Sequence, residues 1–177
     1  MQWTAGGVAL LLAIGLGGWW AYDYWGRLKM EHEYQHAEAA AELLEQMRGV
    51  PVGSDEDLRR SMNLSDSAEI ELLNLDLQSP VARTLNAYDT AIVDQRNAKM
   101  DLEMANLKIK EGELEGKGST SMRGLISKRD NTEAKVEAIA LIVDTCHDDV
   151  AHFLYGTAST NTCEASVRRY EAMYPDK

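Results

Sequence analysis

The hydrophobic pattern begins with an apolar run from Trp3 to Tyr22 that contains no ionisable side chain. About 20 helical residues rising about 1.5 Å each span about 30 Å, which matches the hydrocarbon core of a bilayer. Tryptophan and tyrosine flank the run, as is typical of helices that end at the headgroup region. A cleaved signal peptide has a basic n-region and small residues at its cleavage site, and neither occurs around this run. We therefore predict a single transmembrane anchor over residues 1–26.

A stripe of small residues recurs at every fourth position within this run. Its members are Ala5, Ala9, Ala13, Gly17 and Ala21. Small side chains let two membrane helices approach closely, so the stripe predicts packing against another span, with self-association as one option. Alanine and glycine are also common in membrane helices in general, and this alternative stays open.

Residues 27–78 carry shorter patterns that predict a juxtamembrane helix followed by short helices. Helix-forming residues with a modest apolar stripe continue to about residue 48, where a segment with glycine and proline ends the helix. Ser54 and Asp57 then form a capping pattern for a short helix. A further short segment over 69–77 is partly alternating, and we favour a helix over a strand because its neighbours are helical.

The longest patterns lie in residues 79–155 and predict two long helices folded into an antiparallel, coiled-coil-like hairpin. Ser79-Pro80 is a typical helix start, and a glycine-containing turn at 116–119 separates the two arms. In the second arm the apolar residues keep three–four spacing without interruption, which predicts a heptad seam. This seam consists of Val136, Ile139, Val143, Cys146, Val150 and Phe153.

The first arm of the hairpin has a less regular stripe. Large apolar residues follow four–three spacing as far as Ile92, and Gln95 and Lys99 then interrupt the stripe. The stripe resumes at Met100, Met104, Leu107 and Leu114, which we interpret as a stutter in the seam. We expect the methionines to pack inside the hairpin rather than to bind a metal.

Residues 156–177 predict a loop and a last short helix, which Thr162 caps and Pro175 ends. Cys146 lies on the hairpin seam and Cys163 begins this helix, so a disulfide between them would hold the helix against the hairpin. Two reduced, buried cysteines are the alternative, and the redox state of the compartment decides between the two.

Composition agrees with an all-α fold, because alanine, glutamate, leucine, lysine and methionine are abundant. The net charge of −11 lies entirely beyond the apolar run, and this acidity argues against a nucleic-acid partner. The expected partners are the lipid bilayer and other membrane or envelope proteins, and no cofactor is expected.

Two signals disagree about the side of the membrane on which the body lies. Arg27 and Lys29 directly follow the span, and the positive-inside rule would place the body in the cytoplasm. A cysteine pair in a compact C-terminal unit instead favours an oxidising compartment. Because the charge bias is so small, we favour an extracytoplasmic body and keep the cytoplasmic side as the alternative.

The sharpest chemical motif is the stretch 32–36, which matches the H-E-x-x-H pattern of zinc peptidases. In those enzymes both histidines bind zinc and the glutamate activates water. Lys29 and Glu38 stand where those peptidases carry small or apolar residues, and no second motif supplies a third ligand. A membrane-bound zinc metalloenzyme that uses His32 and His36 is therefore the alternative to a protein without catalytic activity.

Acid–histidine pairs at i, i+3 spacing also raise the possibility of a di-iron centre, as in ferritin-like bundles. The pairs are Glu33 with His36, Asp144 with His147, and Asp149 with His152. Two of them use the shorter aspartate, and those two point to different helix faces. We therefore prefer a solvated helix face opposite the seam.

Together, these patterns predict a non-catalytic, single-pass membrane protein with an acidic helical body. We expect this body to act as a scaffold, a tether or an accessory subunit of a membrane complex.

Overall fold

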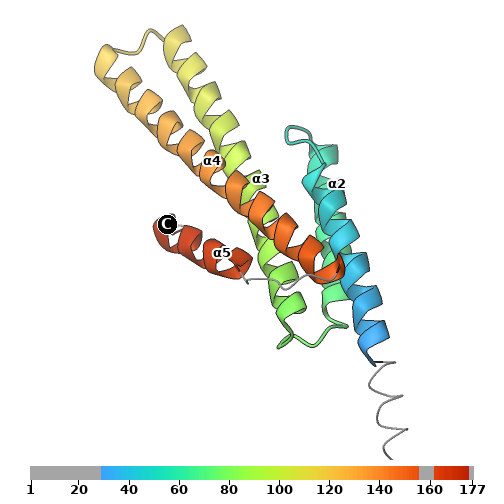
Figure 1. Ribbon diagram of the computed structural model, residues 1–177. Coiled ribbons are helices and arrows are strands. Elements are labelled where there is room, and N and C mark those ends of the chain that lie inside the picture. Colours follow the sequence, from blue (N-terminus) through green and yellow to red (C-terminus); the bar gives the residue numbers. More distant parts are fainter. Residues whose placement is uncertain (1–28, 156–161, 176–177) are drawn as a thin grey trace, which may run out of the picture. The chain divides into compact units, whose positions relative to one another are not determined.

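The computed structural model describes residues 29–155 and 162–175, which contain helices and no strand. Residues 29–48 form a helix, and α2 (Asp55–Leu72), α3 (Pro80–Leu114), α4 (Ser119–Tyr155) and α5 (Thr162–Met173) follow it (Figure 1). The prediction of an all-α fold is therefore confirmed for the described residues. Contacts divide the chain into two compact units, Met1–Gln35 and His36–Lys177.

The membrane anchor falls outside the part of the chain that the structure describes. Among residues 29–155 and 162–175, no helix is both long enough and apolar enough to cross a bilayer. The apolar run from Trp3 to Tyr22, with its stripe of small residues, precedes the described residues. The anchor therefore stays a prediction from the sequence.

α2 is one continuous helix, although the sequence predicted two short ones. Ser54 caps its start, because the hydroxyl oxygen accepts a hydrogen bond from the backbone N–H of Asp57 at 3.1 Å. The serines farther along the helix do not start a second one. Ser67 donates to a backbone carbonyl one turn earlier (2.8 Å), and Ser65 donates to Asp89 of α3 (3.3 Å).

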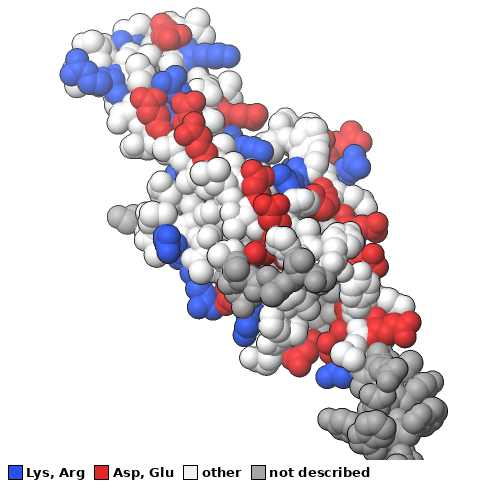
Figure 2. Space-filling model, viewed as in Figure 1, with Lys and Arg blue, Asp and Glu red and all other residues white. Residues whose placement is uncertain are grey.

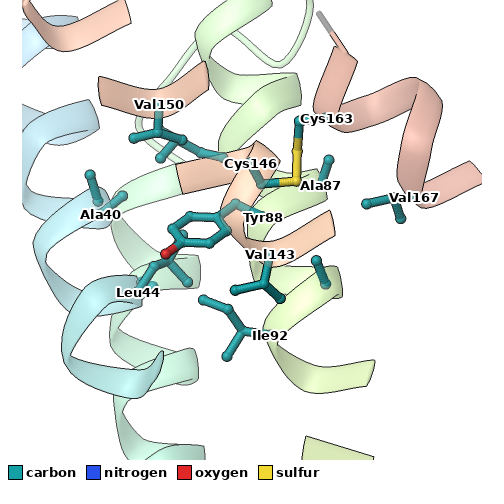
Figure 3. Close-up of a cluster of buried hydrophobic side chains, with 14 of the residues drawn as sticks. Ala40, Leu44, Ala87, Tyr88, Ile92, Val143, Cys146, Val150, Cys163 and Val167 are labelled. Atoms are coloured by element: carbon teal, nitrogen blue, oxygen red, sulfur yellow. A yellow bond between two sulfur atoms is a disulfide. The ribbon is translucent and has the colours of Figure 1, made fainter. Parts of the chain in front are cut away.

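The core of the His36–Lys177 unit forms where residues 36–48 pack against α3 and α4. Fully buried side chains from these three helices are Leu44, Met47, Leu85, Tyr88, Ile92, Ile139 and Val143. Figure 3 shows Leu44, Tyr88, Ile92 and Val143 gathered in one cluster. Burying one large aliphatic side chain contributes about 1.5–3 kcal/mol, so this cluster is a main source of stability.

α5 is held by a disulfide and by a helix cap, both supplied by α4. Cys146 and Cys163 are fully buried and disulfide-bonded, with their Cα atoms 4.6 Å apart (Figure 3). Asp149 accepts hydrogen bonds from the Thr162 hydroxyl and from the Cys163 backbone N–H, both at 2.8 Å. Thr162, expected to be the cap, is instead the first helical residue. The carboxylate of Asp149 takes the capping role, since negative charge is favourable at a helix N-terminus.

α3 and α4 lie side by side along the hairpin and are joined by a short turn at its far end (Figure 1). Gly116 in this turn has a φ of 64°, a conformation that favours glycine. On α4, the seam residues Ile139, Val143 and Val150 are buried, whereas Val136 and Phe153 are half-buried.

The face of α3 that packs against α4 differs from the predicted stripe. Large buried apolar residues extend only as far as Ile92, and a row of small buried residues recurs at every seventh position, at Ala91, Ala98, Ala105 and Gly112. A Cβ added to Gly112 would lie 2.8 Å from Sδ of Met122 and 3.2 Å from Cδ1 of Leu125, both on α4. The predicted stutter is therefore wrong. The inner seam continues through small residues, and Met104, Leu107 and Leu114 are exposed.

Candidate functional site

A cluster of polar side chains joins the helix over residues 36–48 to α3 and α4. Glu45 accepts a hydrogen bond from the hydroxyl of Tyr88 on α3, and the same carboxylate oxygen lies 2.6 Å from Nδ1 of His147 on α4. About one turn later, Arg48 donates to Asp144 at 2.6 Å. Burial, together with the hydrogen bond and charge of Glu45, raises the pKa of Tyr88. The phenol therefore stays neutral, and the cluster fixes the positions of the helices.

A hollow of about 330 Å³ lies next to this cluster, between the helix over residues 36–48 and the end of α4. Glu42, Glu45 and His147 line it together with the apolar side chains of Val150 and Leu154. The carboxylates make the hollow acidic. Glu45 and His147 contact each other at 2.6 Å across the hollow's edge, so this pair helps to hold the two helices together.

The two histidines of the stretch 32–36 have different surroundings in the structure. His32 is exposed, and Nδ1 of His36 lies 2.5 Å from a carboxylate oxygen of Glu71 on α2. Within residues 29–155 and 162–175, no group of three His, Cys, Asp or Glu side chains is placed to hold a metal ion. His36 instead forms a contact that ties its helix to α2.

The other two acid–histidine pairs also serve contacts between helices. Asp144 binds Arg48, and His147 binds the helix over residues 36–48. Asp149 caps α5 and is only 5% exposed. His152, three residues later, is exposed. The di-iron pattern in the sequence therefore corresponds to three separate structural roles.

The most distinctive surface is a row of large apolar side chains on the outer side of α3, which we call the outer seam. Its members are Val93, Met100, Met104, Leu107 and Leu114. Four of them recur every seventh residue and so share one helix face. Met104, Leu107 and Leu114 are 55%, 57% and 89% exposed. The small-residue face of α3 packs against α4, so in the described part of the chain the outer seam is largely uncovered toward the hairpin tip.

α2 and the loop before it run beside the outer seam as far as Leu107 and leave a groove. Two hollows of about 260 and 240 Å³ lie between α2 and α3, and both are lined by Leu58 of α2 and Met100 of α3. Met62 of α2 is a further apolar wall residue. Arg96 fixes the loop before α2, since it donates to the carbonyls of Val50 (2.8 Å) and Pro51 (3.2 Å).

The sequence pattern had predicted that four residues of the outer seam, Met100, Met104, Leu107 and Leu114, lie inside the hairpin. The signal that could have separated the two faces is the second series with a period of seven, from Ala91 to Gly112. The small stripe from Ala5 to Ala21 stays outside this comparison, because those residues are not described.

Comparison with known proteins identifies no relative, since no family model, curated protein or solved structure matches the chain. The function must therefore be inferred from the surfaces described above.

Proposed function

We propose that the protein is a non-catalytic scaffold, anchored in a membrane by residues 1–26, whose hairpin presents the outer seam to a protein partner. It would act as a tether or as an accessory subunit of a membrane complex. The observation that carries this proposal is the exposed row of leucine and methionine on the outer side of α3. Contiguous apolar surface of this kind is typical of protein interaction sites, whereas isolated exposed apolar residues are not.

The internal bonds of the body suit a presenting role. The disulfide and the Asp149 cap attach α5 to α4, and the polar cluster around Glu45 ties three helices together. A hairpin held in this way offers its outer seam without a large loss of conformational entropy on binding. The buried disulfide also supports an extracytoplasmic body, because disulfides persist in oxidising compartments.

The zinc peptidase alternative gains no support from the described residues. Nδ1 of His36 contacts Glu71, which helps to hold α2, and the described residues contain no group of three side chains that could hold a metal ion.

Photo-crosslinking of the full chain in membranes tests the proposal. A photoreactive residue at Leu107 should give a discrete adduct, because this position is exposed on the outer seam. The matched control is Asn106, its exposed neighbour on a different face of α3. In the same membranes, alkaline extraction should leave the full chain in the pellet and release a chain that lacks residues 1–26. Equal or absent adducts at the two positions would refute the presenting role of the seam.

A further inference from the structure

We infer that the partner of the outer seam is a second copy of this chain, bound antiparallel along α3. This inference rests on the proposed function, because it names the partner of the same surface. The outer seam has the heptad pattern of a coiled coil, in which inward positions alternate in spacings of three and four. The inward positions are Val93, Asn97, Met100, Met104, Leu107, Glu111 and Leu114.

A two-fold, antiparallel register brings together the apolar residues at the centre of the outer seam. Met104 then lies opposite Leu107 of the second copy, and Glu111 lies opposite Met100. Every contact occurs twice, because the interface is formed by the same surface on both chains. A parallel register would instead place two copies of Glu111 against each other inside the seam, where like charges are unfavourable.

The charges beside the outer seam match in the antiparallel register. Asp101 faces Lys108 of the second copy on one side, and Glu103 faces Lys110 on the other. Such flanking pairs set the choice and orientation of partners in coiled coils. Figure 2 shows lysine and arginine interspersed with acidic side chains at the hairpin end. Two copies can therefore approach each other here, although each chain carries a net charge of −11.

The two ends of the overlap bring like charges near each other, and the structure weakens both repulsions. Asp94 approaches Glu115 of the second copy, and Arg96 approaches Lys117. Glu115 and Lys117 form an ion pair within one chain at 2.9 Å. Arg96 is directed to the carbonyls of the loop before α2.

The same register explains why the groove beside α2 is open. Leu114, which is 89% exposed in the single chain, is placed opposite Asn97 at the groove of the second copy. Leu58 and Met62, which line that groove, gain an apolar neighbour. One symmetric contact thus covers both the bare hairpin tip and the groove, as expected for the core of an interface.

Zero-length carbodiimide coupling of the full chain in detergent micelles tests the pairing directly. Glu103 and Lys110 are seven residues apart on one helix, about 10.5 Å along its axis, and isotope mixing distinguishes a link between chains from one within a chain. The same holds for Asp101 and Lys108. A mixture of unlabelled and isotope-labelled chains should therefore yield mixed peptides that join Glu103 to Lys110 and Asp101 to Lys108.

Charge reversal tests the register through specificity. Glu103→Lys alone, or Lys110→Glu alone, turns two attractive pairs per dimer into repulsive ones and should weaken self-association about tenfold. Mixing these two variants restores both pairs and should return the affinity to within about twofold of the native chain. Glu113→Lys makes the same charge change at an exposed position away from the seam and should leave the affinity unchanged.

Mixed-isotope links at the stated positions and rescue by mixing would support the inference. Links that join Glu103 to Lys108 would show a parallel pair and overturn it. A discrete adduct at Leu107 with a different protein, without self-coupling, would also overturn it and leave the proposed function standing. The absence of both self-coupling and an adduct at Leu107 would overturn the antiparallel pairing and the proposed function together.

Discussion

Removal of the Cys146–Cys163 disulfide should lower the free energy of unfolding by about 3 kcal/mol. The two cysteines are 17 residues apart, and opening a loop of about that size returns about 3 kcal/mol of conformational entropy to the unfolded chain. For a protein of 177 residues, this loss corresponds to a fall of about 6–12 °C in Tm. α5 loses its covalent attachment to α4 at the same time and is then held by the Asp149 cap and by the buried side chains of Val167 and Tyr170.

Circular dichroism of the full chain in detergent micelles, during thermal and urea unfolding, measures this change. The native chain is compared with the double variant Cys146→Ala/Cys163→Ala, each with and without reductant. Reductant present during unfolding should lower the midpoint of the native chain to that of the variant and leave the variant unchanged. A variant as stable as the oxidised native chain, or equal responses of both proteins to reductant, would refute the reasoning.

Three further changes test other parts of the fold in the same urea titration. Burial raises the pKa of Asp89 in the folded protein. The protonated carboxyl group therefore contributes its full stability below the pKa of the unfolded chain, and this contribution is lost as the pH rises through the pKa of the folded protein. Asp89→Asn should therefore stabilise the protein at neutral pH, and this gain should vanish below about pH 4. Ala98→Leu should overpack the inner seam and cost about 1–3 kcal/mol, whereas Ala134→Leu, at an exposed position, should change stability by less than about 0.5 kcal/mol. Arg96→Met leaves two loop carbonyls without their donor and should cost about 1–3 kcal/mol.

The helices could be predicted where large apolar residues mark the buried face or where a cap marks the start. α4 begins at Ser119 and ends at Tyr155, close to the bounds expected from its uninterrupted heptad. Ser54 and Ser79 both cap the helices that follow them, as their positions before Asp57 and Pro80 indicated. These signals are local, because spacing and capping act within one or two turns of helix.

α3 shows why the same reasoning failed elsewhere. It carries two faces with a period of seven, one of small residues and one that includes Met100, Leu107 and Leu114. The larger apolar side chains predict that the face with Met100, Leu107 and Leu114 is buried. Close packing of the two helices instead buries the face with the small residues. Which face meets α4 is decided by the fit between two helices, and a single-helix pattern does not contain that information.

The polar contacts were beyond sequence reasoning for a related reason. Glu45 meets Tyr88 and His147, which are 43 and 102 residues away along the chain. Such contacts have no periodic signal, and their residue types are equally common on solvated helix faces. The acid–histidine spacings therefore resembled metal sites, although His36, Asp144 and Asp149 each contact a residue outside their own helix.

Antiparallel pairing of α3 leads to a last prediction about tethering. The chain enters the compact unit at His36, which contacts Glu71, and α2 reaches α3 through a short connection at the end opposite the hairpin tip. Pairing along α3 therefore places the entry points of two copies at opposite ends of the paired hairpins. If the predicted anchor over residues 1–26 precedes each entry point, we expect the pair to join copies that stand in two facing membranes.

Liposomes that carry the full chain should therefore cluster, and light scattering should rise with protein density on their surface. Liposomes with Glu103→Lys alone, or with Lys110→Glu alone, should stay dispersed, because each variant repels itself. Mixed populations of the two should cluster with each other, since only facing membranes then carry matched charges. Intact coupling of Glu103 to Lys110 without any clustering would show that the pair forms within one membrane, which would exclude the tether while leaving the antiparallel contact in place.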